Sequence, residues 1–183
     1  MKGKNLNNPE RTPGILSVRR SPRSQTHAIA HFASMRFPAI IGRGGVTSHK
    51  REGDGATPRA PMRLRYGFYR ADRVARPVTR LPMRAIRADD GWCDAPGHPA
   101  YNTPVRLPFS ASHERLMRED RLYDVCIVLD WNLTERRRNA GSAIFLHQTS
   151  PDGTPTAGCI ALDPAALRLV LAHAGQETLV VVE

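Results

Sequence analysis

The chain has 183 residues, 40% hydrophobic and 24% charged, and its 27 basic against 17 acidic residues give a formal net charge of +10. This length supports one domain of ordinary size with its own core, and no stretch approaches the ~20 apolar residues of a membrane-spanning helix. A disulfide-stapled miniprotein and a transmembrane protein are therefore excluded. The arginine-rich charge suits an anionic partner, such as nucleic acid, lipid headgroups or a polyanionic wall, but it does not specify a fold.

The predicted organisation is a disordered basic tail over residues 1–25 and a folded domain over residues 26–183. Lysine, arginine, asparagine and proline dominate the first segment, which is too polar to pack. Its one apolar run, residues 14–18, is shorter than the roughly 7–15-residue core of a secretory signal, and Arg19 and Arg20 follow it. We therefore expect no export signal of that kind in this chain.

Short apolar runs separated by turn residues follow and are typical of strands. We expect strands over 27–33, 37–41, 67–73 and 84–87, with an ordered loop over 50–58. Ser112 is a favourable N-cap and predicts a short helix over 112–117. Runs 125–129, 142–146 and 159–162 predict buried strands. Asp163 as a cap and Pro164 in the first turn predict a helix over 163–174, before a last strand at 178–182. The fold class is mostly β, with two short helices.

One cysteine and one histidine are placed to react together. His147 ends the strand that begins at residue 142, Cys159 begins the next run, and turn-forming residues separate the two. If the runs pair as a hairpin, the two side chains face each other across its mouth, where Cβ atoms lie ~5 Å apart. An imidazole there raises the thiolate fraction of a thiol whose ordinary pKa is ~8.5. Cys159 is then the nucleophile and His147 its base, with the amides of Gly158 and Cys159 as oxyanion donors.

The alternative interpretation of this pair is purely structural. Cysteine is often a small buried hydrophobe, and a strand-end histidine is often bonded to a carbonyl.

Residues 143–147 and 156–162 together resemble the signature of the YkuD-type L,D-transpeptidases. That signature is an apolar strand ending in histidine, a loop, and then Ser/Thr-His-Gly-Cys with an apolar residue. The upstream Thr57-Pro58 resembles the family's Thr-Pro element, so the resemblance spans residues 28–183 and implies an L,D-transpeptidase-like β-sandwich or barrel. Ala157 stands where the family usually has a second histidine, and Ala161 where it often has arginine. These departures, a short loop before Cys159 and an insertion around residues 90–102 indicate a divergent branch.

The resemblance implies a peptidoglycan L,D-transpeptidase of the periplasm, acting on donor and acceptor stem peptides without a cofactor. Cys159 would form a thioester with the donor stem, and an amine of a second stem would resolve it, giving a 3,3 or a 1,3 cross-link. The backbone carbonyl of Gln148 would orient the ring of His147, as a main-chain carbonyl does in this family. A carbapenem adduct on the thiol is a further expectation.

Eight further residues are predicted to bind substrate. The charged residues before the Thr-Pro element would contact the carboxylate and amine of diaminopimelate. Four residues of the insertion would form the wall of a substrate groove, and one threonine belongs to the family signature. They are Lys50, Arg51 and Asp54; Trp92, Asp94, Tyr101 and Asn102; and Thr156. The alternatives are a merely solvated charge run, and aromatic rings that only pack the insertion onto the sheet.

Two other functions compete with cross-linking. The same cysteine and histidine would serve a cysteine peptidase or amidase, such as an L,D-carboxypeptidase, that resolves its acyl-enzyme with water. A basic nucleic-acid-binding module is the less favoured choice, because the basic residues form no aromatic-interleaved RNA signature and no recognition helix is evident. A metal site is not expected either, since the cysteines, His98 and His113 lack ligand spacing.

Overall fold

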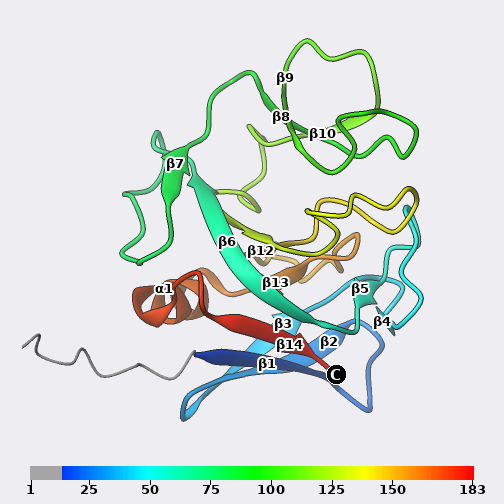
Figure 1. The fold of residues 1–183 in the computed structure, drawn as a ribbon. Helices are drawn as coiled ribbons and strands as arrows, with labels where there is room; N and C mark the ends of the chain where they lie inside the picture. Colours follow the sequence, from blue (N-terminus) through cyan, green and yellow to red (C-terminus); the bar gives the residue numbers. More distant parts are fainter. Residues whose placement is uncertain (1–13) are drawn as a thin grey trace, which may run out of the picture.

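The computed structural model describes residues 14–183, which form a mostly β fold with one helix (Figure 1). Nine strands make one sheet in the order β11-β12-β13-β3-β2-β1-β14-β6-β7, and β11 also pairs with β6, which closes the sheet into a barrel. The strands are β1 (Ile15–Arg20), β2 (His27–Phe32), β3 (Met35–Ile40), β6 (Pro61–Tyr69), β7 (Met83–Ala85), β11 (Val125–Leu129), β12 (Phe145–Gln148), β13 (Ile160–Leu162) and β14 (Leu179–Val182).

The main core fills this barrel. Inward-pointing residues of the strands, among them Leu16, Leu64 and Ile127, are fully buried there. Helix α1 (Pro164–His173) adds a buried stripe of Leu167, Val170 and Leu171 to the same core. The helix forms as its sequence predicts: the Asp163 carboxylate accepts a hydrogen bond from the amide of Ala165 at 2.8 Å, and proline occupies the first turn.

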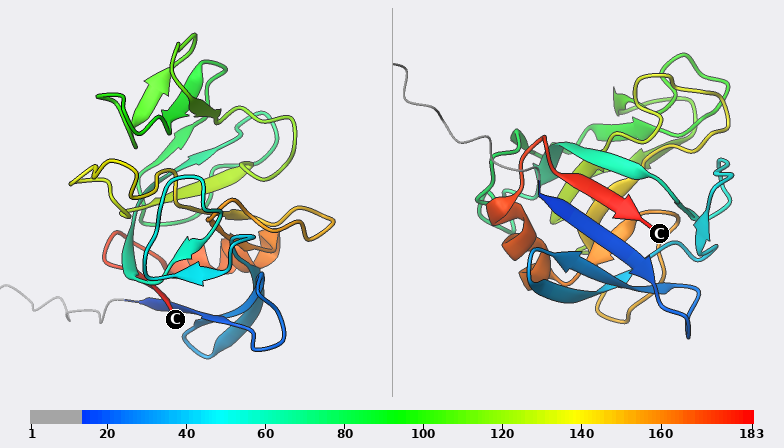
Figure 2. Two further views of the ribbon diagram at one scale, coloured as in Figure 1. Left: turned by 90° about the vertical axis from the view of Figure 1, so that its right-hand side faces the viewer. Right: turned by 60° about the horizontal axis from the view of Figure 1, so that its bottom comes forward.

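A second core lies on the outer face of β6, β11 and β12. A separate three-stranded sheet, in the order β10-β8-β9, packs over this face. Figures 1 and 2 show it as a distinct layer beside the barrel. Its strands are β8 (Asp90–Cys93), β9 (Pro104–Arg106) and β10 (His113–Arg115). Trp92 of β8 packs edge-on against Phe145 of β12, with ring centroids 5.1 Å apart. The insertion predicted from the sequence is thus a small sheet that packs over the outer face of part of the barrel.

Two short strands complete the fold beside the barrel. Strands β4 (Val46–Thr47) and β5 (Thr57–Pro58) pair in parallel, and the loop over residues 50–58 ends in β5. Among the described residues, no helix has both the length and the apolar character needed to cross a membrane.

The structure corrects two expectations about elements. Ile15–Arg20, predicted within a disordered tail over residues 1–25, forms strand β1 between β2 and β14, because Leu16 and Val18 point inward and are fully buried. The rest of that prediction over residues 1–13 lies outside the described residues. The helix predicted over 112–117 is also wrong: His113 and Glu114 pair with Cys93 and Trp92 of β8, and these cross-strand contacts override the capping signal of Ser112.

Candidate active site

His147 and Cys159 lie on one face of two neighbouring strands. Strands β12 and β13 pair in parallel, with Leu146 opposite Ile160 and His147 opposite Ala161, so the predicted hairpin is wrong. Because side chains alternate along strands, Leu146 and Ile160 enter the barrel core, while Phe145, His147 and Cys159 point to the other face. Both His147 and Cys159 line a cleft of ≈ 480 Å³ between the small sheet and the barrel. Both residues therefore line one cleft although the two strands run parallel.

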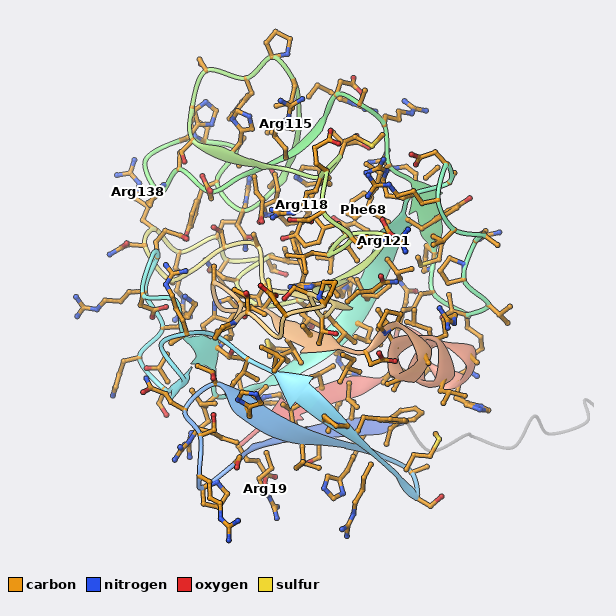
Figure 3. All side chains as sticks on the ribbon, turned by 180° about the vertical axis from the view of Figure 1, so that it is seen from behind. Arg19, Phe68, Arg115, Arg118, Arg121 and Arg138 are labelled. Carbon is orange, nitrogen blue, oxygen red and sulfur yellow. The ribbon has the colours of Figure 1, made fainter. Side chains whose placement is uncertain are left out.

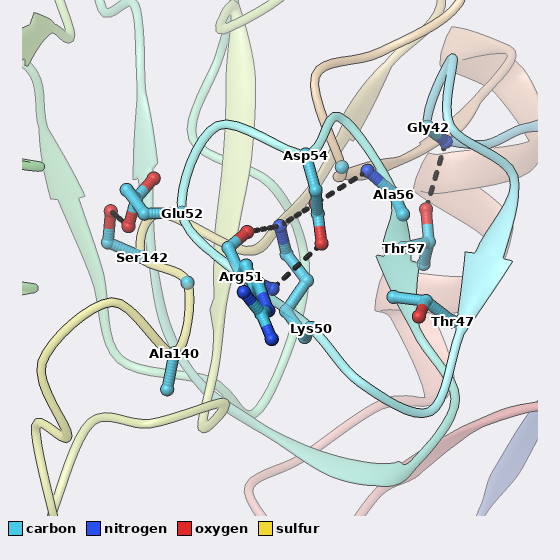
Figure 4. A network of polar contacts seen from close by, with 12 residues as sticks. Gly42, Thr47, Lys50, Arg51, Glu52, Asp54, Ala56, Thr57, Ala140 and Ser142 are labelled. Atoms are coloured by element: carbon cyan, nitrogen blue, oxygen red, sulfur yellow. Dashed lines mark hydrogen bonds and ion pairs between the residues drawn. The ribbon is translucent and has the colours of Figure 1, made fainter.

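The turn before Cys159 is held by threonine hydroxyls. The hydroxyl of Thr156 donates to the carbonyl of Cys159 at 2.7 Å and accepts from the amide of Gly158 at 3.1 Å. The Thr57 hydroxyl donates to the same carbonyl at 3.3 Å and accepts from the amide of Gly42 at 2.9 Å, the bond drawn in Figure 4. The Thr-Pro element therefore stabilises the turn before Cys159 through the hydroxyl of Thr57. The Gly158 amide, expected to stabilise an oxyanion, is already engaged, which leaves the Cys159 amide as the candidate donor.

Gly158 itself is required by its backbone. Its φ of +135° lies in a region that side chains rarely adopt, and a Cβ there would lie 2.9 Å from the carbonyl oxygen of Ala56. The residue before the cysteine therefore has to be glycine for this turn to form.

The ring of His147 is fixed by its own strand. Its Nδ1 lies 2.7 Å from the carbonyl oxygen of Gln148, the contact that the family resemblance implied. A carbonyl can only accept, so Nδ1 carries the proton and Nε2 keeps a lone pair. Tyr123 packs edge-on against the ring at 5.3 Å. Burial lowers the pKa of His147 to about 4, so at neutral pH the ring is an uncharged base.

The thiol of Cys159 is also uncharged at rest. Burial raises its pKa to about 12, and the nearby Glu114 carboxylate adds to the effect. The sulfur donates to the carbonyl of Ala143 at 3.2 Å and accepts from the amide of Phe145 at 3.4 Å. Ala143 has a φ of +51°, a strained value for alanine at the point where its carbonyl meets the thiol. The thiolate expected from the sequence is therefore not the resting state of the free protein.

Several charged residues of the cleft were missed by sequence reasoning. Glu114 accepts a hydrogen bond from the hydroxyl of Tyr123 at 2.6 Å, and the Arg118 guanidinium lies over the ring of Tyr123, 5.1 Å from its centroid. Figure 3 shows Arg118 at the junction of the barrel with the small sheet that carries Arg115. Glu114 comes from the segment predicted as a helix, Arg118 follows that segment, and no spacing signal pointed to either residue. Arg43 and Glu52 also line the cleft.

Lys50, Arg51 and Asp54, which were predicted to bind substrate, do not line the cleft. They bond to one another: the Lys50 ammonium contacts Asp54 and donates to the carbonyl of Arg51 at 2.8 Å, and the Arg51 amide donates to Asp54 at 2.7 Å (Figure 4). Lys50 is buried whereas Arg51 and Asp54 are exposed, so the alternative of a solvated charge run is wrong for Lys50 alone. The run is an internal brace of the loop over residues 50–58.

Most of the insertion residues that were predicted to form a groove wall are buried. Trp92 and Tyr101 are buried and neither lines the cleft, which makes the groove role wrong for both. Asn102 is buried too: its oxygen accepts from Trp92 Nε1 and the amide of Ala143, both at 3.0 Å, and its nitrogen donates to the carbonyls of Trp131 and Asn132. Asp94, in contrast, does line the cleft, as does Thr156.

Comparison with protein families gives one match. The model of the YkuD family, described as an L,D-transpeptidase catalytic domain, matches residues 32–182. The searches of curated proteins and of solved structures returned no match.

Proposed function

The chain belongs to the YkuD family of L,D-transpeptidase catalytic domains, and from this premise we propose that it cross-links peptidoglycan stem peptides through a thioester on Cys159. The observation that carries the proposal is the common cleft of Cys159 and His147, with the ring of His147 held by the Gln148 carbonyl so that Nε2 is free. A nucleophile, a base and a group that orients the base are the parts that covalent acyl transfer requires.

The first half-reaction acylates the cysteine. As the sulfur attacks the donor carbonyl, the thiol proton leaves the Ala143 carbonyl and passes to Nε2 of His147. The resulting imidazolium is stabilised by the Gln148 carbonyl, which accepts from Nδ1–H, and the Cys159 amide faces the oxyanion. Collapse of the tetrahedral intermediate breaks the donor's C–N bond, and the leaving amine takes the proton from Nε2.

The second half-reaction runs the same steps in reverse. A neutral amine of the acceptor stem attacks the thioester and gives its proton to Nε2, and the departing sulfur recovers it. Water in place of the amine would give a shortened monomer, which is the hydrolytic alternative. The same cleft would serve both reactions, and the product depends on whether an amine or water reaches the thioester first.

The stem peptides lie outside the cytoplasmic membrane, so the proposal includes a periplasmic site of action. The linkage is set by the donor residue that forms the thioester: the third stem residue gives a 3,3 cross-link, and the first gives a 1,3 cross-link.

Purified muropeptides test the proposal. The wild-type chain should convert monomers into dimers, whose fragmentation identifies the linked residues, and Cys159→Ala should make none. Cys93→Ala, which removes another buried cysteine, should retain activity. Shortened monomers without dimers would replace cross-linking by hydrolysis, and turnover that survives Cys159→Ala would refute the assignment of the nucleophile.

A further inference from the structure

The side of the barrel centred on β1 exposes apolar side chains. Among the described residues four large hydrophobic side chains are well exposed, and two of them, Ile15 at 52% and Ile29 at 41%, point outward from β1 and β2. The strand register places Leu179 of β14 opposite Ile15 and Pro38 of β3 opposite Ile29, and residues that pair across strands share a face. Exposed apolar groups gathered on one face are typical of a contact with a partner or a membrane.

The same side of the barrel is basic. We call the β1 face the outward-pointing residues of β1, β2, β3 and β14 and of residues 61–65 of β6. None of them is acidic, whereas Arg36, Arg63 and Arg65 are all exposed. Within the described part of the chain, no carboxylate forms an ion pair with any of these three guanidinium groups. Arg36 and Arg63 lie four strands apart, about 19 Å along the sheet, so the charge spans the whole face.

Two acids border the β1 face and do not cancel its charge. Glu183, which follows β14, pairs with Arg19 of β1 at 2.7 Å. Asp130 accepts a hydrogen bond from the backbone amide of Arg63 at 2.7 Å and does not pair with its guanidinium. The four arginines of the face outnumber these two acids, so the face is net positive.

The β1 face lies away from the catalytic cleft. Three strand steps separate β1 from β13, whose outer side lines the cleft. Figure 3 shows Arg19 at one end of the molecule and Arg115 of the small sheet at the other, with Arg118 of the cleft between them. A surface bound by the β1 face therefore leaves the cleft open.

The combination of charge and exposed isoleucine selects among partners. A second copy of the chain would bring its own net positive face against this one, so charge opposes self-association here. Nucleic acid would pair with the arginines, but the face has no outward Phe, Tyr or Trp on which bases could stack. An anionic bilayer offers phosphates to the guanidinium groups and an apolar boundary to Ile15 and Ile29.

We propose that the β1 face docks this protein on a membrane surface with anionic headgroups. Its arginines contact lipid phosphates, and Ile15 and Ile29 enter the boundary between the headgroups and the acyl chains. The inference goes beyond the proposed function and does not depend on Cys159. It gives a role to part of the arginine excess of the sequence.

Sedimentation of the full chain with lipid vesicles tests the proposal. One set of vesicles contains phosphatidylcholine and phosphatidylglycerol in equal parts, and the other contains phosphatidylcholine alone. We expect binding to the mixed vesicles only, and this binding should weaken as salt screens the charges. The double variant Arg36→Gln/Arg63→Gln should bind about 25-fold more weakly, which is about fivefold for each arginine near an anionic surface.

Matched variants separate the β1 face from the overall charge. Arg115→Gln/Arg121→Gln removes two exposed charges that lie in the other half of the molecule in Figure 3, and it should bind nearly as the wild type does. Ile29→Ser should weaken binding at both low and high salt, because the apolar contact is not screened. Thermal melting checks that each variant is folded, and Ile15→Ser replaces Ile29→Ser if the latter melts early. Cys159→Ala should bind like the wild type.

Four results would overturn the proposal. The first is an absence of binding to the mixed vesicles, and the second is an equal loss in the two arginine pairs, which would show that only the overall charge matters. The third is unchanged binding after the isoleucine substitutions, which would indicate a face for an anionic polymer. The fourth is a dimer in analytical ultracentrifugation that Ile29→Ser dissociates, which would make the face a contact between copies.

Discussion

Asn102 joins the small sheet to the cysteine site, and its removal should be the most disruptive single change at the rim of the cleft. Its side chain makes four hydrogen bonds and is 1% exposed: it accepts from Trp92 and Ala143 and donates to the carbonyls of Trp131 and Asn132. Asn102→Ala leaves two buried N–H donors without an acceptor, at about 1–3 kcal/mol each. Its φ of +57° adds about 1 kcal/mol for alanine.

The expected loss in the free energy of unfolding is therefore about 3–7 kcal/mol, a large fraction of the roughly 5–15 kcal/mol that holds a domain together. Urea unfolding followed by circular dichroism measures it. Asn139→Ala is the matched control, because Asn139 also has a positive φ, of +62°, but is exposed. If the two variants lose the same stability, the hydrogen bonds of Asn102 contribute nothing and the reasoning fails.

Three further predictions concern the site itself. Because the pKa of Cys159 is about 12, its alkylation by iodoacetamide in the free protein should still be accelerating at pH 10, and a plateau below pH 8 would show a resting thiolate. Gly158→Ala places a Cβ 2.9 Å from the Ala56 carbonyl at a φ of +135°, so we expect at least about 1–3 kcal/mol of destabilisation and lost turnover; wild-type melting would contradict the strain. His147 has a folded pKa of about 4 against 6.5 when unfolded, so the unfolded state binds more protons between these values, and stability should rise with pH across that window by up to about 3 kcal/mol. His147→Gln should flatten that rise, and an unchanged pH profile in this variant would show that another group causes it.

The core of the fold was predictable because its signals are local. The apolar runs that became β11, β12 and β13 are buried along their whole length, and Asp163-Pro164 marks the start of α1. The mostly β class follows from such runs and is confirmed. Strand direction, in contrast, depends on pairing partners far away in sequence. The segment between β12 and β13 carries turn residues, which suggested a hairpin, but Ala161 pairs with Ile40 of β3 on its other side and β13 runs parallel to β12.

The sequence predicted the two central residues of the candidate site, His147 and Cys159, but not most of the residues that surround them. A histidine and a cysteine at the ends of buried runs were identified from the residue pattern, and the contact of the Gln148 carbonyl with the ring was expected from the family resemblance. The lining was missed where it depends on tertiary contacts. Trp92 was predicted either to wall the groove or to pack the insertion onto the sheet, and it packs against Phe145. Glu114 was assigned to a helix, but it forms strand β10 because that segment pairs with β8.

The charge state was also beyond the sequence. The spacing of His147 and Cys159 suggested that the imidazole raises the thiolate fraction, but it carries no information about how deeply the two residues are buried. Burial disfavours both charged forms, which lowers the pKa of the imidazole and raises that of the thiol.

Intact-protein mass spectrometry tests the central claim most directly. The chain is incubated with a stem tetrapeptide, or with a carbapenem as a slowly released acyl donor, and quenched in acid. Acylation at Cys159 predicts a mass increase equal to the acyl group on the wild-type chain and on Cys93→Ala, and none on Cys159→Ala. An adduct that persists in Cys159→Ala, or a wild-type chain that stays unmodified with both reagents while muropeptides are consumed, would contradict the thioester mechanism.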